Sequence, residues 1–442
     1  MNKKVLTVAL AFIGITVGAG FASGQEVLQY FSGFGVWGIV GAVITGAVFS
    51  FAGLVVVQLG SYFLASDHNV VFGGVAHPFL ARLFDIIITF TLFSLGFVMI
   101  AGGGSNLEQQ FGLPTWVGAA IITVLVMLVG MLDVDKVTKI IGMMTPVLIL
   151  CVLIVVIWSF THIDAAWEDI HESAQLVDTA LPAWHISTLN YVGVCLSTVV
   201  SMAIVMGGDI TDLKVAGRGG MIGGVVYGVL LTLVAGALLT QMTTVYDQDM
   251  PMLALVNHIH PWFGFAMAIV TFLMIFNTAI AMFYALAKRF SHGGDMRFRV
   301  ILLALTVAGF GLSFLGFKEL VNKLFPILGY CGIVLMVVLF YSWIKTRQDI
   351  IDESERRGRI LKLIRRRLRL DRGFSRKHAR QLRHEVEDSD VENVELVDAM
   401  GAVAAEELEE EGIDHDDWEP IADRQENQAA TEAGEQVSAD KH

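Results

Sequence analysis

The chain has 442 residues, of which 55% are hydrophobic and 17% charged, with a mean hydropathy of +0.63. Soluble domains carry about 25% charged residues, whereas the apolar residues here gather in blocks of about 20 with almost no charge inside. This composition excludes a soluble enzyme, a secreted disulfide scaffold and a nucleic-acid-binding protein. It predicts a membrane protein.

The net charge of −13 is distributed unevenly. Residues 1–350 hold 15 basic and 18 acidic side chains, residues 351–383 hold 13 and 4, and residues 384–442 hold 2 and 21. We therefore expect a transmembrane core over residues 1–345, followed by a basic segment and an acidic tail. The 3 cysteines all lie in apolar blocks and indicate no disulfide framework.

Ten apolar blocks reach, or nearly reach, the length of a bilayer-crossing helix. They comprise residues 5–31, 37–65, 80–110, 116–133, 138–160, 186–207, 219–241, 262–289, 298–316 and 319–344. With a cytoplasmic N-terminus, all basic loop residues except Lys318 and Lys323 fall inside, as the positive-inside rule requires. The sequence predicts an all-α, multi-pass protein of the cell membrane with both termini in the cytoplasm.

The start of the chain has an alternative interpretation. Lys3 and Lys4, an apolar stretch and the small residues Ala19–Ser23 are typical of a cleaved signal peptide. We expect the segment to be retained, because apolar sequence continues through Val27–Phe31 and because its glycines need another explanation.

The first apolar block contains four glycines, at positions 14, 18, 20 and 24. Each costs a helix interior about 1 kcal/mol relative to alanine. One explanation is close helix packing through small residues. The other is a helix that unwinds near Gly18–Gly20, so that freed main-chain groups bind substrate and ion. Ten spans favour the second explanation, because two halves of five helices insert with opposite topology, as in inverted-repeat transporters.

Two segments, Gly18–Glu26 and Ala101–Pro114, resemble the YkvI-type family of bacterial membrane proteins, which are relatives of amino-acid permeases. The stretch Lys136–Pro146 resembles the Lys-x-x-Met-Pro motif of sodium-coupled amino-acid and neurotransmitter symporters, with Thr145 as one extra residue. The resemblance covers residues 1–345. It implies a five-plus-five inverted repeat of the LeuT type, within the APC superfamily, in which helices 1 and 6 are discontinuous.

The resemblance also implies a sodium site. In LeuT-type symporters, main-chain carbonyls before the helix 1 break join two side-chain oxygens of helix 8 around one ion. Position by position, these groups fall on Gly14, Val17, Asn277 and Thr278. Many relatives have two adjacent hydroxyls in helix 8, where this chain has Thr278 alone; polar contact between helices is the alternative role. Because Lys139 lies near the cytoplasmic end of helix 5 and not at its centre, we expect sodium rather than a proton to be the coupling ion, and no other cofactor.

The same architecture places the solute at mid-membrane, beside the helix breaks. The expected contacts come from helices 1, 3 and 6: Gly18, Ala19, Gly20, Phe21, Phe93, Ser94, Asn190, Ser197 and Thr198. An outer half-helix beginning near Gly20 directs its N-terminal amides at the centre of the membrane, which favours a carboxylate. A small amino acid is therefore the expected solute.

Other polar residues suggest accessory roles. We expect Glu26, beyond the break, to form an outer gate with Lys323, because intramembrane charges are functional by default. Residues Met250–Asn257 are expected to form a short helix over the outer vestibule. His258 and His260 are interpreted as loop surface, because no further metal ligands cluster with them in the sequence.

In the basic segment, residues 351–383, Ile360, Ile364 and Leu368 recur every four residues. This pattern predicts an amphipathic helix on the anionic inner leaflet. Residues 384–442 are acidic and poor in aromatic residues, so we expect disorder. Folding back onto the basic segment, or binding of a partner protein, are the alternatives.

Together these features predict a secondary-active symporter that imports a small amino acid with sodium. One alternative keeps the fold but couples to protons, or carries an osmolyte or another zwitterion. A second alternative is a non-transporting sensor or scaffold that acts through the tail. An enzyme is not expected, because no span carries a convergent acid/base or metal-binding set.

Overall fold

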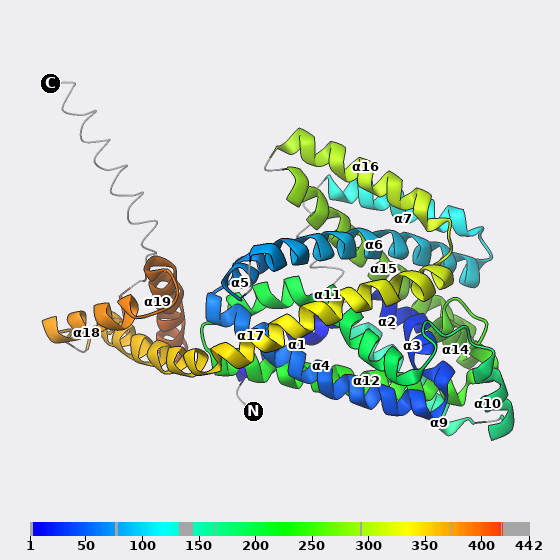
Figure 1. Cartoon of the computed structure of the whole chain (residues 1–442), viewed down its shortest axis with the longest axis horizontal. Helices are drawn as coiled ribbons and strands as arrows, with labels where there is room; N and C mark the ends of the chain where they lie inside the picture. The colour runs from blue at the N-terminus through cyan, green and yellow to red at the C-terminus, as the bar shows by residue number, and fades with distance from the viewer. Residues whose placement is uncertain are drawn as a thin grey trace.

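The computed structural model describes residues 3–75, 78–131, 145–163, 165–291, 294–371, 373–416 and residue 418. Within these ranges the chain is almost entirely helical (Figure 1). Lys136 and Lys139, together with residues 419–442 of the acidic tail, lie outside the described residues.

In the described part of the chain, seven helices are long and apolar enough to cross a membrane, as judged by length and composition. These helices are α4 (Val36–Phe63), α6 (Pro78–Phe111), α11 (Trp184–Gly208), α12 (Leu213–Thr240), α15 (Pro261–Ser291), α16 (Asp295–Ser313) and α17 (Phe317–Leu368). Two expected spans correspond to shorter apolar helices, α7 (Thr115–Gly130) and α9 (Thr145–Thr161). The protein is therefore an all-α, multi-pass membrane protein, and the five-plus-five repeat stays a prediction.

The first apolar block is interrupted, as predicted. It consists of α1 (Lys3–Thr16), α2 (Ala19–Ser23) and α3 (Gln25–Tyr30), followed by a short 3₁₀ turn, η1 (Ser32–Phe34). The predicted break in helix 6 is wrong, because α11 runs without interruption over 25 residues. The two helices differ in their glycine content, which explains why only the first is interrupted. Before its last turn α11 has a single glycine, Gly193, and the missing side chain there admits the main chain of α17.

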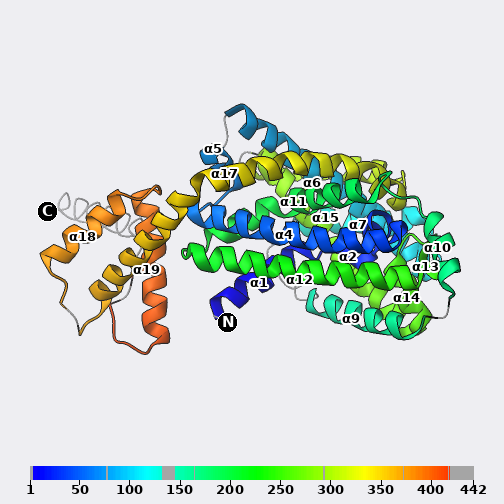
Figure 2. The ribbon, with the colours of Figure 1, turned by 60° about the horizontal axis from the view of Figure 1, so that its bottom comes forward.

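The helices pack in two groups, visible in Figures 1 and 2. In one group α12 lies against α4 and α1, and α11 lies against α4. In the other, α15 packs on α6, α6 on α7, and α16 on all three. Glycines allow the closest approach in the first group: a Cβ atom on Gly46 of α4 would lie 2.7 Å from the Cα of Gly228 in α12. Such small-residue contacts are typical of helix packing in membranes.

The two ends of the bundle differ. The N-terminal end carries the start of α1, the helix α5 (His68–Val75) and the tail helices, as both views show. The far end carries α10 (Trp167–Gln175), α13 (Met242–Val245) and α14 (Pro251–Ile259). The helix expected over residues 250–257 is thus confirmed as α14, and it packs on α2 and α3.

The tail corrects two expectations. Residues 376–387 and 393–410 form α18 (Arg376–Glu387) and α19 (Asn393–Glu410), although disorder was expected from residue 384 onward. The stripe of Ile360, Ile364 and Leu368 is buried against α18 and α19 and is not free to lie on lipid. The reason is an apolar row in α19 itself, with four-residue spacing, which the acidic composition obscures. This row consists of Leu396, Met400, Ala404 and Leu408.

Polar contacts fasten the tail to the N-terminal end of the bundle. The guanidinium of Arg357, in the C-terminal part of α17, donates to the main-chain oxygens of Ser61 and Tyr62, both at 2.7 Å, and to Glu353 at 2.8 Å. Lys4 at the start of α1 pairs with Glu407 of α19 at 2.8 Å. The tail therefore touches the first helix, the one that contains the break.

Candidate functional site

The main chain leaves helical geometry between α1 and α2. The Val17 amide still donates to the Ile13 carbonyl at 2.8 Å, but Gly18 is extended (φ −107°, ψ −167°). The next helix begins with the Ala22 amide bonding to the Gly18 carbonyl at 3.1 Å. Because the last carbonyls and first amides of helices have no partners within their own helix, the break leaves main-chain polar groups available in the middle of the bundle.

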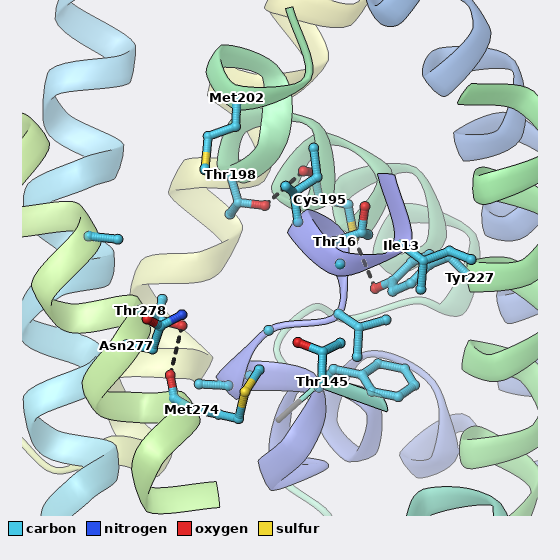
Figure 3. A pocket seen from close by; sticks show the side chains of 18 of the residues that line it. Ile13, Thr16, Thr145, Cys195, Thr198, Met202, Tyr227, Met274, Asn277 and Thr278 are labelled. Carbon is cyan, nitrogen blue, oxygen red and sulfur yellow. Dashed lines mark hydrogen bonds between the residues drawn. The ribbon is translucent and has the colours of Figure 1, made fainter. Parts of the chain in front are cut away.

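A cavity of about 700 Å³ adjoins this break (Figure 3). Its wall is formed by α1, α2, α3, α6, α9, α11, α12, α15 and α17. Two of its lining residues, Leu10 and Met202, are more than half exposed. The cavity is closed toward the far end, where Phe21, Tyr227 and Phe325 are at most 2% exposed.

All the solute and sodium contacts expected from helices 1 and 8 line this cavity. They are Gly14, Val17, Gly18, Ala19, Gly20, Phe21, Asn277 and Thr278, with Thr198 from α11. Gly14 and Gly18 face open space, because a Cβ atom on either would meet nothing within 4 Å. The structure therefore brings the predicted sodium ligands and part of the predicted solute site to one cavity.

Four predicted contacts lie elsewhere. Asn190 joins three helices: it accepts from the Tyr30 hydroxyl at 3.1 Å and donates to the Pro326 carbonyl at 2.9 Å. The Ser197 hydroxyl donates to the Val194 carbonyl within α11. Neither residue lines the cavity, because α11 stays coiled where the prediction assumed an unwound helix 6.

On α6, the expected side-wall residues face away from the cavity. Phe93 packs against the rings of Phe97 and Phe283, and Ser94 is fully buried. The cavity is lined instead by Leu95 and Met99, one helical turn apart. The prediction chose the wrong face of this helix. Because the helix is apolar on all sides, its sequence pattern does not show which face borders the cavity.

The two α15 residues line the cavity and each carries a side-chain oxygen. Asn277 Oδ1 is buried and has no hydrogen-bond partner among the described residues. The Thr278 hydroxyl donates to the Met274 carbonyl at 3.0 Å, which leaves its oxygen lone pairs available. Both side chains lie across the cavity from the end of α1 (Figure 3). These oxygens are the ligand type that a hard cation prefers.

Glu26 is placed differently from the prediction. Its carboxylate lines the cavity, accepts from the Tyr191 hydroxyl at 3.1 Å and lies beside Gly20, where an added Cβ atom would be 2.7 Å from Oε2. Lys323, its expected gate partner, is 80% exposed and pairs with Glu319 at 2.7 Å. The Glu26–Lys323 gate is therefore not formed in this structure.

The kink at Gly24 explains why Glu26 reaches back to the break. Gly24 is left-handed (φ +76°) between α2 and α3, a conformation that costs most other residues about 1–2 kcal/mol. A Cβ atom there would also lie 2.7 Å from the side chain of Met252 in α14. The kink redirects α3, so that its first turn points the Glu26 carboxylate at Gly20.

A chain of polar contacts continues from Glu26 into the bundle. The Tyr191 and Tyr227 hydroxyls are 3.1 Å apart, and the Cys195 Sγ is 3.4 Å from the Tyr227 hydroxyl. Tyr227 and Cys195 line the cavity, as does Thr145. Sequence reasoning missed these residues, and only the density of polar residues in 187–201 pointed toward α11.

No group of three or more metal-binding side chains occurs among the described residues. His258 and His260 are exposed at the far end, in keeping with the surface role expected of them. The site is therefore an apolar cavity with a broken helix, one carboxylate and a few neutral oxygens. Together with the interrupted first helix, these features are typical of the LeuT-type fold.

Comparisons with known proteins agree with this class. No protein-family model matches the chain. The chain is 25% identical over 349 residues to the uncharacterised membrane protein YkvI of Bacillus subtilis. The matched region covers 77% of this chain and 97% of YkvI. The chain is 27% identical over 332 residues to the uncharacterised protein YyaD of the same organism, covering 75% and 94%.

Two solved structures share the fold. MhsT in complex with L-phenylalanine superposes with a TM-score of 0.57 at 14% identity, over 90% of this chain and 96% of MhsT. The inward-facing conformation of Mhp1 gives a TM-score of 0.50 at 11% identity, over 92% and 91%. The chain is thus similar to YkvI and YyaD over most of its length, and it shares the fold of MhsT and Mhp1.

Proposed function

We propose that this protein is a secondary-active symporter that imports a small amino acid together with sodium. The observation that carries the proposal is the interrupted first helix, whose freed main-chain groups border a cavity of about 700 Å³. Irregular backbone at membrane depth is tolerated only where it is buried in protein or lines a cavity. Transporters use such breaks to bind solute and ion.

The open side of the cavity supports an inward-facing state. With the N-terminus in the cytoplasm, the exposed lining residues Leu10 and Met202 face the cytoplasm. Gly14 and Val17 line the same cavity as Asn277 and Thr278. We propose that these four groups hold sodium when α1 and α15 approach, and release it when they separate.

An inward movement of sodium supplies enough free energy for transport. One charge moving through 100 mV contributes about 2.3 kcal/mol, which corresponds to roughly 50-fold accumulation of a neutral solute at 1.4 kcal/mol per tenfold. The chemical gradient of sodium adds to this. Coupling to a single sodium ion is therefore sufficient to accumulate the solute inside the cell.

Uptake into proteoliposomes tests the proposal. The full chain is reconstituted and given a mixture of radiolabelled amino acids under an inward sodium gradient, with protein-free liposomes as the control. We expect accumulation above equilibrium that disappears when choline replaces sodium. Uptake that persists in choline and collapses with a protonophore would contradict sodium coupling. The absence of uptake for every amino acid would contradict the assigned solute class.

A further inference from the structure

Glu26 is the single acidic or basic residue among the described residues that line the cavity. The rest of the lining is apolar, or polar and neutral. Because an isolated carboxylate is costly to bury, a buried one is normally paired or hydrogen-bonded. Intramembrane ionisable residues accordingly mark functional sites. A cation is therefore expected near Glu26.

No side chain supplies that cation in the described part of the chain. The expected partner, Lys323, is exposed and bound to Glu319. The carboxylate is instead held by a neutral donor, the Tyr191 hydroxyl at 3.1 Å, and by packing against Gly20. It is thus fixed in place and turned to the cavity without a countercharge.

We propose that Glu26 binds the cationic amino group of the solute, so that the amine and not the carboxylate is the group this cavity requires. The inference rests on the proposed function in that it takes the cavity to be the solute site. It replaces the expectation, drawn from the sequence, that the main chain near Gly20 binds the carboxylate of the solute. In the structure the Glu26 carboxylate already lies against Gly20. A second negative group at that place would be repelled.

The remaining lining indicates the rest of the solute. Leu95, Met99, Met274 and Phe325 offer apolar surface, and the rings of Phe21 and Tyr227 lie 5.8 Å apart. Aromatic faces attract cations as well as apolar groups. We therefore assign the solute to the class of primary amines with a sizeable apolar side chain. An α-carboxylate is tolerated but not required.

Matched probes test this assignment by thermal unfolding of the purified full-length protein in detergent. Three compounds share the leucine side chain (L-leucine, isoamylamine and 4-methylpentanoate), and three share the phenylalanine side chain (L-phenylalanine, phenethylamine and 3-phenylpropanoate). We expect at least one amine and its amino acid to raise the melting temperature in a saturable way, and neither acid to do so. Acids that stabilise as well as the amines, or six probes without effect, would overturn the proposal.

Variants locate the effect. Glu26→Gln removes the charge at nearly constant volume and is expected to weaken amine binding at least tenfold. Glu108→Gln makes the same change at an exposed position of α6 and is expected to leave binding unchanged. Wild-type amine affinity in Glu26→Gln would overturn the proposal. If that variant does not fold, Glu26→Asp keeps the charge, and equal binding of acids and amines by Glu26→Asp would overturn it instead.

This experiment is independent of coupling, because it uses no gradient and is run both with and without sodium. Amine binding combined with sodium-independent uptake would refute sodium symport and leave the Glu26 assignment standing. Sodium-driven uptake of an amino acid whose binding survives Glu26→Gln would refute the assignment and leave symport standing.

Discussion

Replacing Gly20 by alanine separates the role of Glu26 from that of the fold. The new Cβ atom would lie 2.7 Å from Oε2 and 3.1 Å from Oε1 of Glu26. The flexible end of the glutamate must therefore move, which disturbs its bond from Tyr191. Gly20 itself lies within α2. Alanine there gains up to about 1 kcal/mol of helix propensity, so we do not expect the protein to unfold.

The magnitude follows from the hydrogen bond between the amine and the Glu26 carboxylate, which the displaced carboxylate no longer makes. A hydrogen bond to a charged group contributes about 1.5–3 kcal/mol, which is roughly 10- to 150-fold in affinity. We expect Gly20→Ala to raise the apparent dissociation constant for phenethylamine by that factor, as measured by thermal-shift titration, with a nearly unchanged melting temperature in the absence of ligand. Gly311→Ala, where a Cβ atom meets nothing within 4 Å, is the control. Wild-type affinity in Gly20→Ala would refute the reasoning.

Three further predictions concern the ion site and the tail. Thr278→Val keeps the shape of the side chain but removes its oxygen, and is expected to raise the sodium concentration for half-maximal uptake at least tenfold, measured in proteoliposomes. Arg357→Met removes one of the two guanidinium groups that pair with the fully buried Glu353, which keeps Arg356 at 2.9 Å. It also leaves the main-chain oxygens of Ser61 and Tyr62 without their donor, and is expected to cost about 3 kcal/mol in unfolding free energy. The exposed pair made by Arg359 is the matched control, and Arg359→Met is expected to cost less than about 1 kcal/mol in the same denaturation assay. Removal of residues 389–442 uncovers the apolar face of α17. We expect a lower melting temperature and a lower membrane abundance, with the uptake per molecule retained. Loss of uptake at normal membrane abundance would contradict this expectation.

The membrane class and the interrupted first helix were predictable from the sequence because they rest on strong local signals. Four glycines within one apolar block have few structural explanations, and the break lies where they predict it. Helix 6 lacked that signal, and its polar residues turned out to be satisfied by contacts such as Asn190 to Pro326. Polarity in a span therefore did not distinguish a binding site from contact between helices.

Two other features depended on contacts between distant segments. The position of Glu26 follows from the kink at Gly24 and from Tyr191, which is 165 residues away along the chain. The sequence indicated an important carboxylate but not the direction in which it points. Similarly, composition predicted disorder for residues 393–410, because net charge hides an apolar row that becomes useful only when α17 covers it.

The most direct test of the whole account is an experimental density map of the full-length protein with saturating phenethylamine and sodium. We predict density for the amine between residues 18–21 and α15, with its nitrogen at the Glu26 carboxylate, and a first helix that remains interrupted. A continuous helix over residues 3–30, or an amine bound away from this cavity, would contradict the account.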